Sequence, residues 1–291
     1  MYLTSLIQRG LMLLVVCAPY VAANPNPSPY PEVDYPVTFA DVAALPLAQG
    51  AIPHAYGSQP SQFGLLYLPR NAEPIPLVML VHGRCWLSDD GVEHLQPLAS
   101  ALVRAGYAVW VPEYRRVGED GGGWPGTFDD MRSALQAVTS LAPSRIDTSR
   151  TVLAGHSAGG HLALWLATRE QAVDSDITVR GAVGLAAMTD LATYRELENS
   201  CADVTERLLG GGPLDVPERY RDASPATVAQ PSLPIHLVHG SLDDTVPLSQ
   251  SEAMPHAGLE ILDGAGHYDL IHPGTQAFPA LLRAIENVLS P

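Results

Sequence analysis

From about residue 60, the chain alternates between short apolar runs and longer segments with helical periodicity. Short apolar runs bounded by turn-forming residues predict buried strands, whereas apolar positions that recur every three or four residues predict amphipathic helices. The predicted strands are 63–68, 77–81, 108–112, 151–154, 181–186, 235–238 and 259–262. The predicted helices are 95–104, 128–141, 158–169, 203–209, 249–254 and 276–289. This alternation predicts an α/β fold with a mostly parallel central sheet and helices on both faces.

Two segments depart from the alternation. Residues 187–231 contain three consecutive glycines and several prolines, so we expect a small insertion that caps the sheet. Residues 24–37 are rich in proline, which predicts an extended linker rather than a folded element. We therefore expect an N-terminal extension over 24–59 and one folded domain over 60–291.

The first 23 residues have the pattern of a signal peptide. Arg9 is the only charged residue among the first 31, it precedes the apolar run 11–18, and small residues follow at 21–23. The run is too short to span a bilayer comfortably. We expect cleavage before Asn24, no stable membrane span afterwards, and a periplasmic or secreted protein; an uncleaved anchor is the alternative.

Composition narrows the classes of function. The chain has 291 residues and a net charge of -15, and all 16 of its basic residues are arginine. An acidic chain without lysine argues against nucleic-acid binding, which needs a basic surface. It also excludes Schiff-base chemistry on lysine and the lysine of a P-loop. Hydrophobic residues make up 46% of the chain, which is enough for a core and excludes disorder throughout.

One short motif carries candidate chemistry. The sequence GHSAGG at 155–160 joins the predicted strand 151–154 to the predicted helix 158–169. A G-x-S-x-G turn between strand and helix lifts the serine hydroxyl above the edge of the sheet. The N-terminal end of the helix then faces negative charge that develops beside the serine. This context predicts that Ser157 is a nucleophile, whereas the alternative is a serine that only caps the helix.

A serine nucleophile needs a base, which an acid orients. Asp243 and Asp244 follow the predicted strand 235–238, and His267 follows the predicted strand 259–262. The order serine, aspartate, histidine is the chain order of α/β-hydrolases. We expect Asp243 to be the acid and His267 the base, because Asp244 is placed to cap the segment that follows.

The remaining histidines are expected to serve the structure. Three of them end predicted strands, where we expect them to hold loops together: His82, His156 and His239. His267, Asp269 and His272 lie close in sequence, but their spacing matches no standard zinc motif. We therefore expect no metal site.

The loop after the predicted strand 77–81 follows the carboxyl end of that strand, where a loop that supplies hydrogen-bond donors to the oxyanion is expected. The oxyanion of an acyl-transfer reaction requires backbone N–H donors from a second loop and from the residue after the nucleophile. We expect these donors to be the amides of Arg84, Cys85 and Ala158. Trp86 is expected to form a wall of the substrate pocket.

These motifs carry a resemblance to a known family. HGRCW at 82–86 and GHSAGG at 155–160 resemble the H-G-G-x-W and G-x-S-A-G-G motifs of a branch of α/β-hydrolase esterases. That branch includes bacterial feruloyl and acetyl esterases, carboxylesterases related to hormone-sensitive lipase, and kynurenine formamidase. The resemblance extends from about residue 60 to residue 290 and includes EYRR at 113–116 and GWP at 123–125.

The resemblance implies a Ser–Asp–His triad, an acyl-enzyme, a small-molecule ester as substrate and no cofactor. In these esterases the GWP loop often approaches the active site, which implies a substrate contact for Trp124. Arg84 stands where the family usually has glycine. A positive φ at that position would strain an arginine, and its side chain would either bind an anionic substrate group or point into solvent.

Two cysteines remain once residues 1–23 are removed, Cys85 and Cys201. The expected compartment is oxidising, and both cysteines are expected near the carboxyl edge of the sheet, one in the oxyanion loop and one in the cap. We predict a disulfide between them; the alternative is two thiols that pack as small apolar side chains.

Together these features predict an exported serine carboxylesterase that hydrolyses small acyl or aryl esters. A formamidase or amidase would use the same triad with a nitrogen leaving group. A dipeptidyl-type peptidase is a further alternative, although the chain has no room for the propeller that usually gates such enzymes. An inactive binding module is disfavoured by the intact set of serine, aspartate and histidine.

Overall fold

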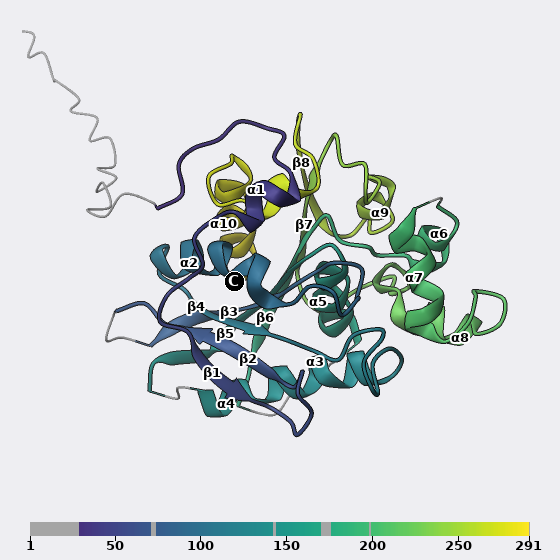
Figure 1. Cartoon of the computed structure of the whole chain (residues 1–291), viewed down its shortest axis with the longest axis horizontal. Helices are drawn as coiled ribbons and strands as arrows, with labels where there is room; N and C mark the ends of the chain where they lie inside the picture. Colours follow the sequence, from purple (N-terminus) through teal and green to yellow (C-terminus); the bar gives the residue numbers. More distant parts are fainter. Residues whose placement is uncertain (1–28, 71–73, 142–143, 170–175, 198, 291) are drawn as a thin grey trace, which may run out of the picture.

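The structure is a computed structural model that describes residues 29–70, 74–141, 144–169, 176–197 and 199–290. Within this part of the chain, one eight-stranded sheet has the order β1-β2-β4-β3-β5-β6-β7-β8 (Figure 1). The strands are β1 (Ile52–Ala55), β2 (Phe63–Tyr67), β3 (Ile75–Val81), β4 (Ala108–Pro112), β5 (Ile146–His156), β6 (Val179–Leu185), β7 (Ile235–Gly240) and β8 (Gly258–Leu262). Neighbouring strands run parallel in the part of the sheet ordered β4-β3-β5-β6-β7-β8. In contrast, β2 is antiparallel to both of its neighbours, β1 and β4. The predicted mostly parallel sheet is therefore confirmed.

Helices cover both faces of this sheet. Successive side chains of a buried strand point to opposite faces, so they enter two separate hydrophobic cores, one on each face. In β3, Leu77 and Met79 join the core under α3 (Gly126–Gln136) and α5 (Ala158–Arg169). Val78 and Leu80 enter the opposite core, under α2 (Gln96–Arg104) and α10 (Ala277–Leu289). The other described helices and turns are α1 (Phe39–Ala43), η1 (Val92–Leu95), α4 (Val138–Leu141), α6 (Leu191–Arg195), α7 (Ser200–Leu209), α8 (Pro217–Ala223), η2 (Pro225–Thr227), α9 (Ser249–Glu252) and η3 (Tyr268–Ile271).

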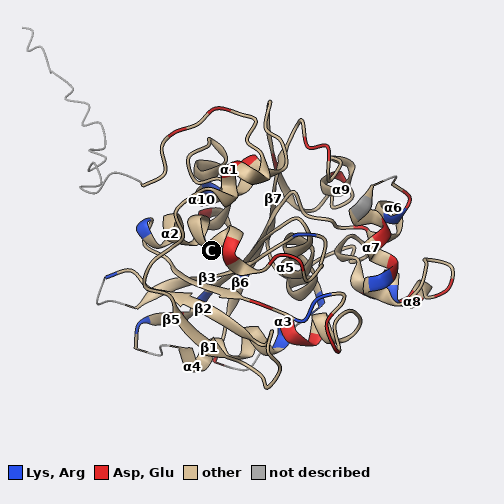
Figure 2. Ribbon diagram, viewed as in Figure 1, with Lys and Arg blue, Asp and Glu red and all other residues tan. Residues whose placement is uncertain are grey.

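Charged residues lie mainly on the helices and loops, while the strands of the sheet are mostly uncharged (Figure 2). Each predicted strand corresponds to a strand of the sheet, and the predicted helix 158–169 matches α5. The predicted helix 128–141 is instead divided into α3 and α4. None of the described helices is long and apolar enough to cross a membrane.

The segment between β6 and β7 includes residues 187–231, for which we expect a cap. It forms α6, α7, α8 and η2, and Figure 1 shows the three helices gathered at one edge of the molecule. Asn199 caps the N-terminal end of α7, where its side chain accepts a hydrogen bond from the amide of Ala202. Gly210 ends the same helix at φ 77°, a left-handed conformation that glycine adopts without steric cost.

The N-terminal extension is not a free linker in its described part, which corrects the sequence-based expectation. Tyr30 is buried, and the amide of Val33 donates to the carbonyl of Gly274 at 3.0 Å. The amide of Val37 donates to Asp269 Oδ1 at 2.9 Å. The sheet also begins at Ile52 rather than after residue 60, since β1 pairs with β2 along the edge of the sheet. The expected signal peptide over 1–23 lies outside the described residues.

Candidate active site

Ser157 occupies the sharp turn between β5 and α5. Its φ of 57° lies in the left-handed region, which a residue other than glycine adopts only when its surroundings enforce it. A Cβ atom at Gly159 would overlap the carbonyl oxygens of Val81 and His82, so the helix start packs directly on the end of β3. This close packing fixes the turn and positions Ser157 at the carboxyl edge of the sheet.

Asp243 and His267 form a hydrogen-bonded pair beside this turn. His267 Nδ1 lies 2.7 Å from Asp243 Oδ2. The other carboxylate oxygen of Asp243 accepts the amides of Thr245 at 2.9 Å and Val246 at 2.8 Å. Burial alone would raise the pKa of Asp243, but the hydrogen bond and charge of His267 and the two amides together lower it. The carboxylate is therefore ionised and oriented toward the imidazole. Asp244 is exposed, and within the described part of the chain its carboxylate accepts one hydrogen bond, from the Thr245 hydroxyl at 3.3 Å.

One cavity brings the candidate residues together. Its free volume is about 280 Å³, including the part open to solvent. The lining residues are Arg84, Cys85, His94, His156, Ser157, Cys201, Thr245, His267 and Tyr268. The described residues include no hydrogen bond between the Ser157 hydroxyl and His267, a contact that is often long in free enzymes and tightens with substrate.

Three histidines hold the loops of the site, as predicted from their places at strand ends. His156 Nε2 bonds the carbonyl of His267 at 3.0 Å, and burial lowers the pKa of His156 so that it stays neutral. His239 bonds the carbonyl of Val246 at 2.9 Å, which steadies the loop of Asp243. His82 bonds Glu113 at 2.8 Å below the oxyanion loop.

The loop predicted to supply the oxyanion donors follows β3 and lies against Ser157. A Cβ atom at Gly83 would lie 2.7 Å from the carbonyl oxygen of His156, so only glycine fits this approach. The backbone amides of Arg84, Cys85 and Ala158 donate no hydrogen bond to another described residue. These three amides therefore remain available to an oxyanion. The φ of Arg84 is 70°, which is the strained conformation expected if glycine were replaced there.

The Arg84 side chain adopts neither of the two expected arrangements. Its Nε donates to Asp90 at 2.6 Å, and its Nη1 donates to the Tyr268 hydroxyl at 3.3 Å. The guanidinium also lies over the ring of Phe39, 4.2 Å from its centroid. The charge is thus balanced within the protein, and the side chain joins the oxyanion loop to the N-terminal segment and to the loop of His267.

The two tryptophans assigned to the substrate pocket lie elsewhere. Trp86 is fully buried, and its Nε1 donates to His161 at 3.2 Å, so its ring belongs to the core rather than to a pocket wall. Trp124 packs edge-on against Phe128, and its amide donates to the carbonyl of Leu208 in α7. Neither side chain lines the cavity of Ser157. The two loops have the HGRCW and GWP motifs that resemble the esterase family, but these motifs do not determine where the tryptophan rings point.

Four residues line the cavity although the sequence predicts no part for them in it: His94, His156, Thr245 and Tyr268. Tyr268 directly follows the predicted base, and Thr245 follows the predicted acid closely, so proximity in sequence could have indicated both. His94 comes from η1, and no motif marks it.

His267, Asp269 and His272 do not gather into a cluster. Asp269 accepts the amides of Gly266 and Val37, while His272 Nδ1 accepts the amide of Gly274 at 3.1 Å. The described residues contain no group of three or more histidine, cysteine, aspartate and glutamate side chains that could hold a metal ion.

A disulfide joins Cys85 to Cys201, with a Cα–Cα distance of 5.1 Å across a sequence separation of 116 residues. It connects the oxyanion loop to α7. A crosslink over so long a loop stabilises a protein mainly by restricting the unfolded chain. Reduction is therefore expected to lower the free energy of unfolding by about 2–4 kcal/mol and to weaken turnover, because the Cys85 amide loses its tether.

Denaturant unfolding with and without a thiol reductant measures this loss. The double variant Cys85→Ala/Cys201→Ala serves as the control, since its stability should not respond to the reductant. Titration of two free thiols in the unfolded, unreduced chain beginning at Asn24 would contradict the crosslink.

The sheet order, the serine at the turn into α5, and an aspartate and a histidine after β7 and β8 define an α/β-hydrolase. The chain belongs to the BD-FAE family of α/β-hydrolase esterases, whose model matches residues 65–257. The match includes Ser157 and Asp243, and His267 lies beyond its end. None of the curated proteins matches the chain.

Solved esterase structures share the fold at low sequence identity. A truncated carbohydrate esterase from gut microbiota is 21% identical with a TM-score of 0.69, and the match covers 84% of this chain and 98% of that one. Esterase B from Lactobacillus rhamnosis is 20% identical with a TM-score of 0.71, over 86% and 90% of the two chains. Esterase 2 of Thermogutta terrifontis is 21% identical with a TM-score of 0.64, over 83% and 93%.

Proposed function

We propose that this esterase is a serine carboxylesterase that hydrolyses small acyl or aryl esters through a covalent acyl-enzyme. The observation that carries the proposal is the 2.7 Å bond between His267 and ionised Asp243 beside a cavity that also contains Ser157. The family and the order of the three residues along the chain support the same assignment.

In the first half-reaction, Ser157 Oγ attacks the ester carbonyl carbon while His267 Nε2 takes the hydroxyl proton. His267 Nδ1 keeps its proton and donates a hydrogen bond to Asp243, whose carboxylate stabilises the imidazolium that forms. The carbonyl oxygen becomes an oxyanion that the amides of Arg84, Cys85 and Ala158 bind. His267 then donates the proton to the departing alcohol oxygen, which leaves the acyl group on Ser157.

In the second half-reaction, water enters the position that the alcohol has left. His267 removes one of its protons, and the resulting hydroxide attacks the acyl carbon. The same amides bind the second oxyanion. Collapse of this intermediate returns the proton to Ser157 Oγ and releases the carboxylic acid, so one ester and one water give one acid and one alcohol.

Two further parts of the proposal concern substrate size and location. The small size of the cavity that contains Ser157 favours a short acyl or a single aryl group. Export to the periplasm or beyond is supported by the Cys85–Cys201 disulfide, since such crosslinks persist in oxidising compartments.

Three substrates test the reaction class in parallel. p-Nitrophenyl acetate reports ester hydrolysis, an N-formyl aromatic amine reports formamidase activity, and a dipeptidyl anilide reports peptidase activity. We expect turnover of the ester to exceed that of both amides by orders of magnitude. Preference for the formyl amide or the anilide would replace the proposal by the corresponding alternative, and no turnover of any of the three would point to a binding module.

The pH dependence follows from the state of the base. His267 faces the carboxylate of Asp243, the imidazole of His156 and the phenol of Tyr268. Since the pKa of Asp243 is lowered, the carboxylate stays ionised through mild acid, and the acid limb of kcat/KM belongs to protonation of one imidazole. We expect activity to fall with a slope of one proton as the pH decreases. A slope of two would contradict this assignment.

Acid also lowers stability, so the pH profile needs a control. Burial lowers the pKa of His94 to about 3 and that of His161 to about 4. The unfolded chain therefore binds protons that the folded chain cannot. As a result, the free energy of unfolding decreases as the pH falls from the ordinary histidine range toward these values. A near-ultraviolet circular dichroism signal that stays constant over the acid limb separates protonation of His267 from unfolding, because reversible unfolding would also recover at neutral pH.

A further inference from the structure

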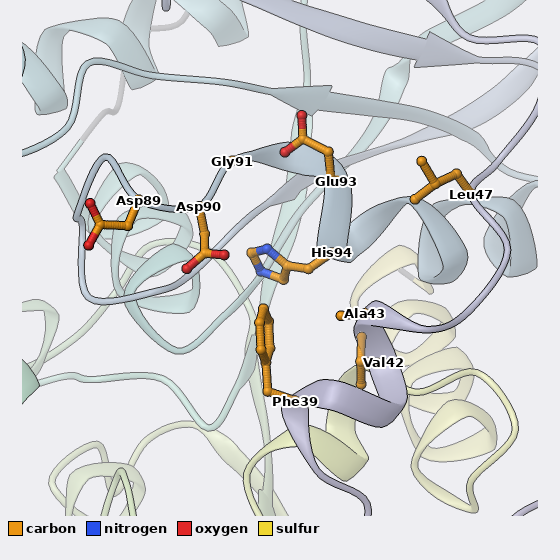
Figure 3. A pocket seen from close by; sticks show the side chains of 9 residues that line it. All are labelled: Phe39, Val42, Ala43, Leu47, Asp89, Asp90, Gly91, Glu93 and His94. Atoms are coloured by element: carbon orange, nitrogen blue, oxygen red, sulfur yellow. The ribbon is translucent and has the colours of Figure 1, made fainter.

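A second cavity lies between the N-terminal helix α1 and the loop that leads into η1 (Figure 3). Its free volume, including the part open to solvent, is about 560 Å³, compared with about 280 Å³ for the cavity of Ser157. Arg84 lies between the two, because it lines the first cavity and bonds Asp90 of the second. The lining residues of the second cavity are Phe39, Val42, Ala43, Leu47, Asp89, Asp90, Gly91, Glu93 and His94.

His94 is a buried polar residue of this lining whose hydrogen-bonding groups are unused. It is only 6% exposed, yet neither ring nitrogen forms a hydrogen bond with a described residue. Figure 3 shows its ring between the Asp90 carboxylate and the ring of Phe39, whose centroid lies 5.9 Å away. Both nitrogens are therefore available to a polar group that enters the cavity.

The imidazole of His94 is uncharged near neutral pH. Burial, together with His82 and Arg84 nearby, lowers its pKa to about 3. The carbonyl of Gly91 opposes this shift without reaching hydrogen-bond geometry. A neutral imidazole has one donor nitrogen and one acceptor nitrogen. Since a buried polar group without a partner is unfavourable, binding is favoured for a ligand that donates a hydrogen bond to the acceptor nitrogen.

The charges of the lining favour a cation. Three carboxylates line the cavity, those of Asp89, Asp90 and Glu93. The carboxylate of Asp90 is balanced by Arg84, whose Nε lies 2.6 Å from Asp90 Oδ2. Among the described residues, Asp89 and Glu93 have no ion pair. The remaining negative charge attracts a positively charged ligand and repels an anion.

The cation that suits this lining is organic rather than a metal ion. Within the described ranges, no group of three or more histidine, cysteine, aspartate and glutamate side chains could hold a metal. Helix α1 and the segment after it instead add apolar side chains to the cavity, among them Val42 and Leu47. Leu47 is 48% exposed, so contact with an apolar ligand removes part of its surface from water.

We propose that the cavity between α1 and η1 binds an organic ammonium ion with an apolar body, at a site separate from that of Ser157. The ammonium group donates to the acceptor nitrogen of His94 and to the carboxylate of Asp90. The apolar body lies on Leu47 and on the apolar side chains of α1. The proposal does not depend on the esterase reaction, because the proposed triad takes no part in this binding.

Three small molecules with different head groups test the class of ligand. 2-Phenylethylammonium, 2-phenylethanol and phenylacetate share a phenyl ring on a short carbon chain and differ mainly in charge. Isothermal titration calorimetry near neutral pH and at low ionic strength gives the Kd of each. We expect the ammonium ion to bind about tenfold more tightly than the alcohol, because its hydrogen bonds are charge-assisted, and phenylacetate to bind most weakly. Equal Kd values for the ammonium ion and the alcohol, tightest binding of phenylacetate, or no binding of the ammonium ion would overturn the proposal.

Variants of two residues that line only the second cavity locate the site. Glu93→Gln removes a charge and Leu47→Ser removes apolar surface, and both side chains reach solvent, so the fold should tolerate either change. We expect each to raise the Kd of 2-phenylethylammonium about two- to fivefold. The matched controls are Glu252→Gln, at an exposed residue of α9, and Ile261→Ser, at a residue of β8 that is 47% exposed. The controls should leave the Kd as it is, and a Kd unchanged in both cavity variants would contradict the proposal.

His94→Phe tests the buried imidazole, since it keeps a planar ring and removes both nitrogens. We expect the Kd of 2-phenylethylammonium to rise about tenfold. His94 lines both cavities, so Thr245→Val, at a residue that lines only the cavity of Ser157, is made alongside it and should leave the Kd unchanged. An unaltered Kd in His94→Phe, or an equal rise in both variants, would count against the site. If His94→Phe does not fold, Glu93→Gln and Leu47→Ser still decide the question.

Discussion

Replacing either Ser157 or His267 by alanine is expected to lower kcat by about 10³-fold or more, and the double variant should lose little beyond either single variant. The reason is that nucleophile and base act in one step: without His267 the hydroxyl keeps its proton, and without Ser157 the imidazole has no nucleophile to activate. What remains is catalysis by the oxyanion amides and by binding alone.

Steady-state kinetics with p-nitrophenyl acetate compare the kcat of each single variant and of the double variant with that of the unmodified enzyme. Ser149→Ala is a matched control, because Ser149 lies on the same strand β5 as the turn but near its opposite end. Exposed His256 provides the matching histidine control, as His256→Ala. Both control variants should remain as active as the unmodified enzyme. Losses that multiply in the double variant would show that Ser157 and His267 act independently.

Asp243→Asn is expected to reduce kcat by about 10³-fold, while Asp244→Asn should leave it within about a factor of two. The amide keeps the size of the carboxylate but removes the charge that stabilises the imidazolium. It also offers an N–H group where His267 Nδ1 needs an acceptor, which favours the wrong tautomer. Asp244 is exposed and makes no contact with the imidazole, so its charge contributes little.

The two asparagine variants are compared at one pH with the same ester, together with their unfolding transitions. A loss of activity in Asp244→Asn with full activity in Asp243→Asn would transfer the role of the acid to Asp244. The lowered pKa of Asp243 also makes stability depend on pH. The ionised carboxylate stabilises the folded state above the ordinary carboxyl range, and this stabilisation is lost as the pH falls through the lowered value. Asp243→Asn should therefore flatten the decrease of stability in acid.

The parts of the fold that the sequence predicts are those with strong local signals. The central strands are continuous apolar runs, since both of their faces are buried, and α5 follows a glycine-rich turn that marks its start. β1 escaped prediction because it is an edge strand whose four residues, Ile52–Ala55, are mostly exposed and include a proline and a histidine. The partners of such a strand are set by the sheet rather than by its own pattern.

The same difference separates the residues of the candidate site that the sequence predicts from those that it does not. Ser157, Asp243 and His267 each follow a strand at a short motif, so backbone position alone brings them together at the carboxyl edge. The side chains of Arg84, Trp86 and Trp124 belong to loops whose conformation depends on contacts from distant segments. Arg84 bonds Tyr268, which lies 184 residues further along the chain. No local pattern encodes a partner at that distance.

The packing of the N-terminal segment against the loop of His267 has a consequence for the order of assembly. The hydrogen bond from Val37 to Asp269 joins residues 232 positions apart. At ordinary rates of synthesis, the early residue waits roughly 10–50 seconds for its partner. Contacts of such long range also slow folding, because the ends must meet before the contact stabilises either of them. The loop of His267 is therefore fixed only when nearly the whole chain has emerged, and we expect an unfinished chain to lack the proposed site.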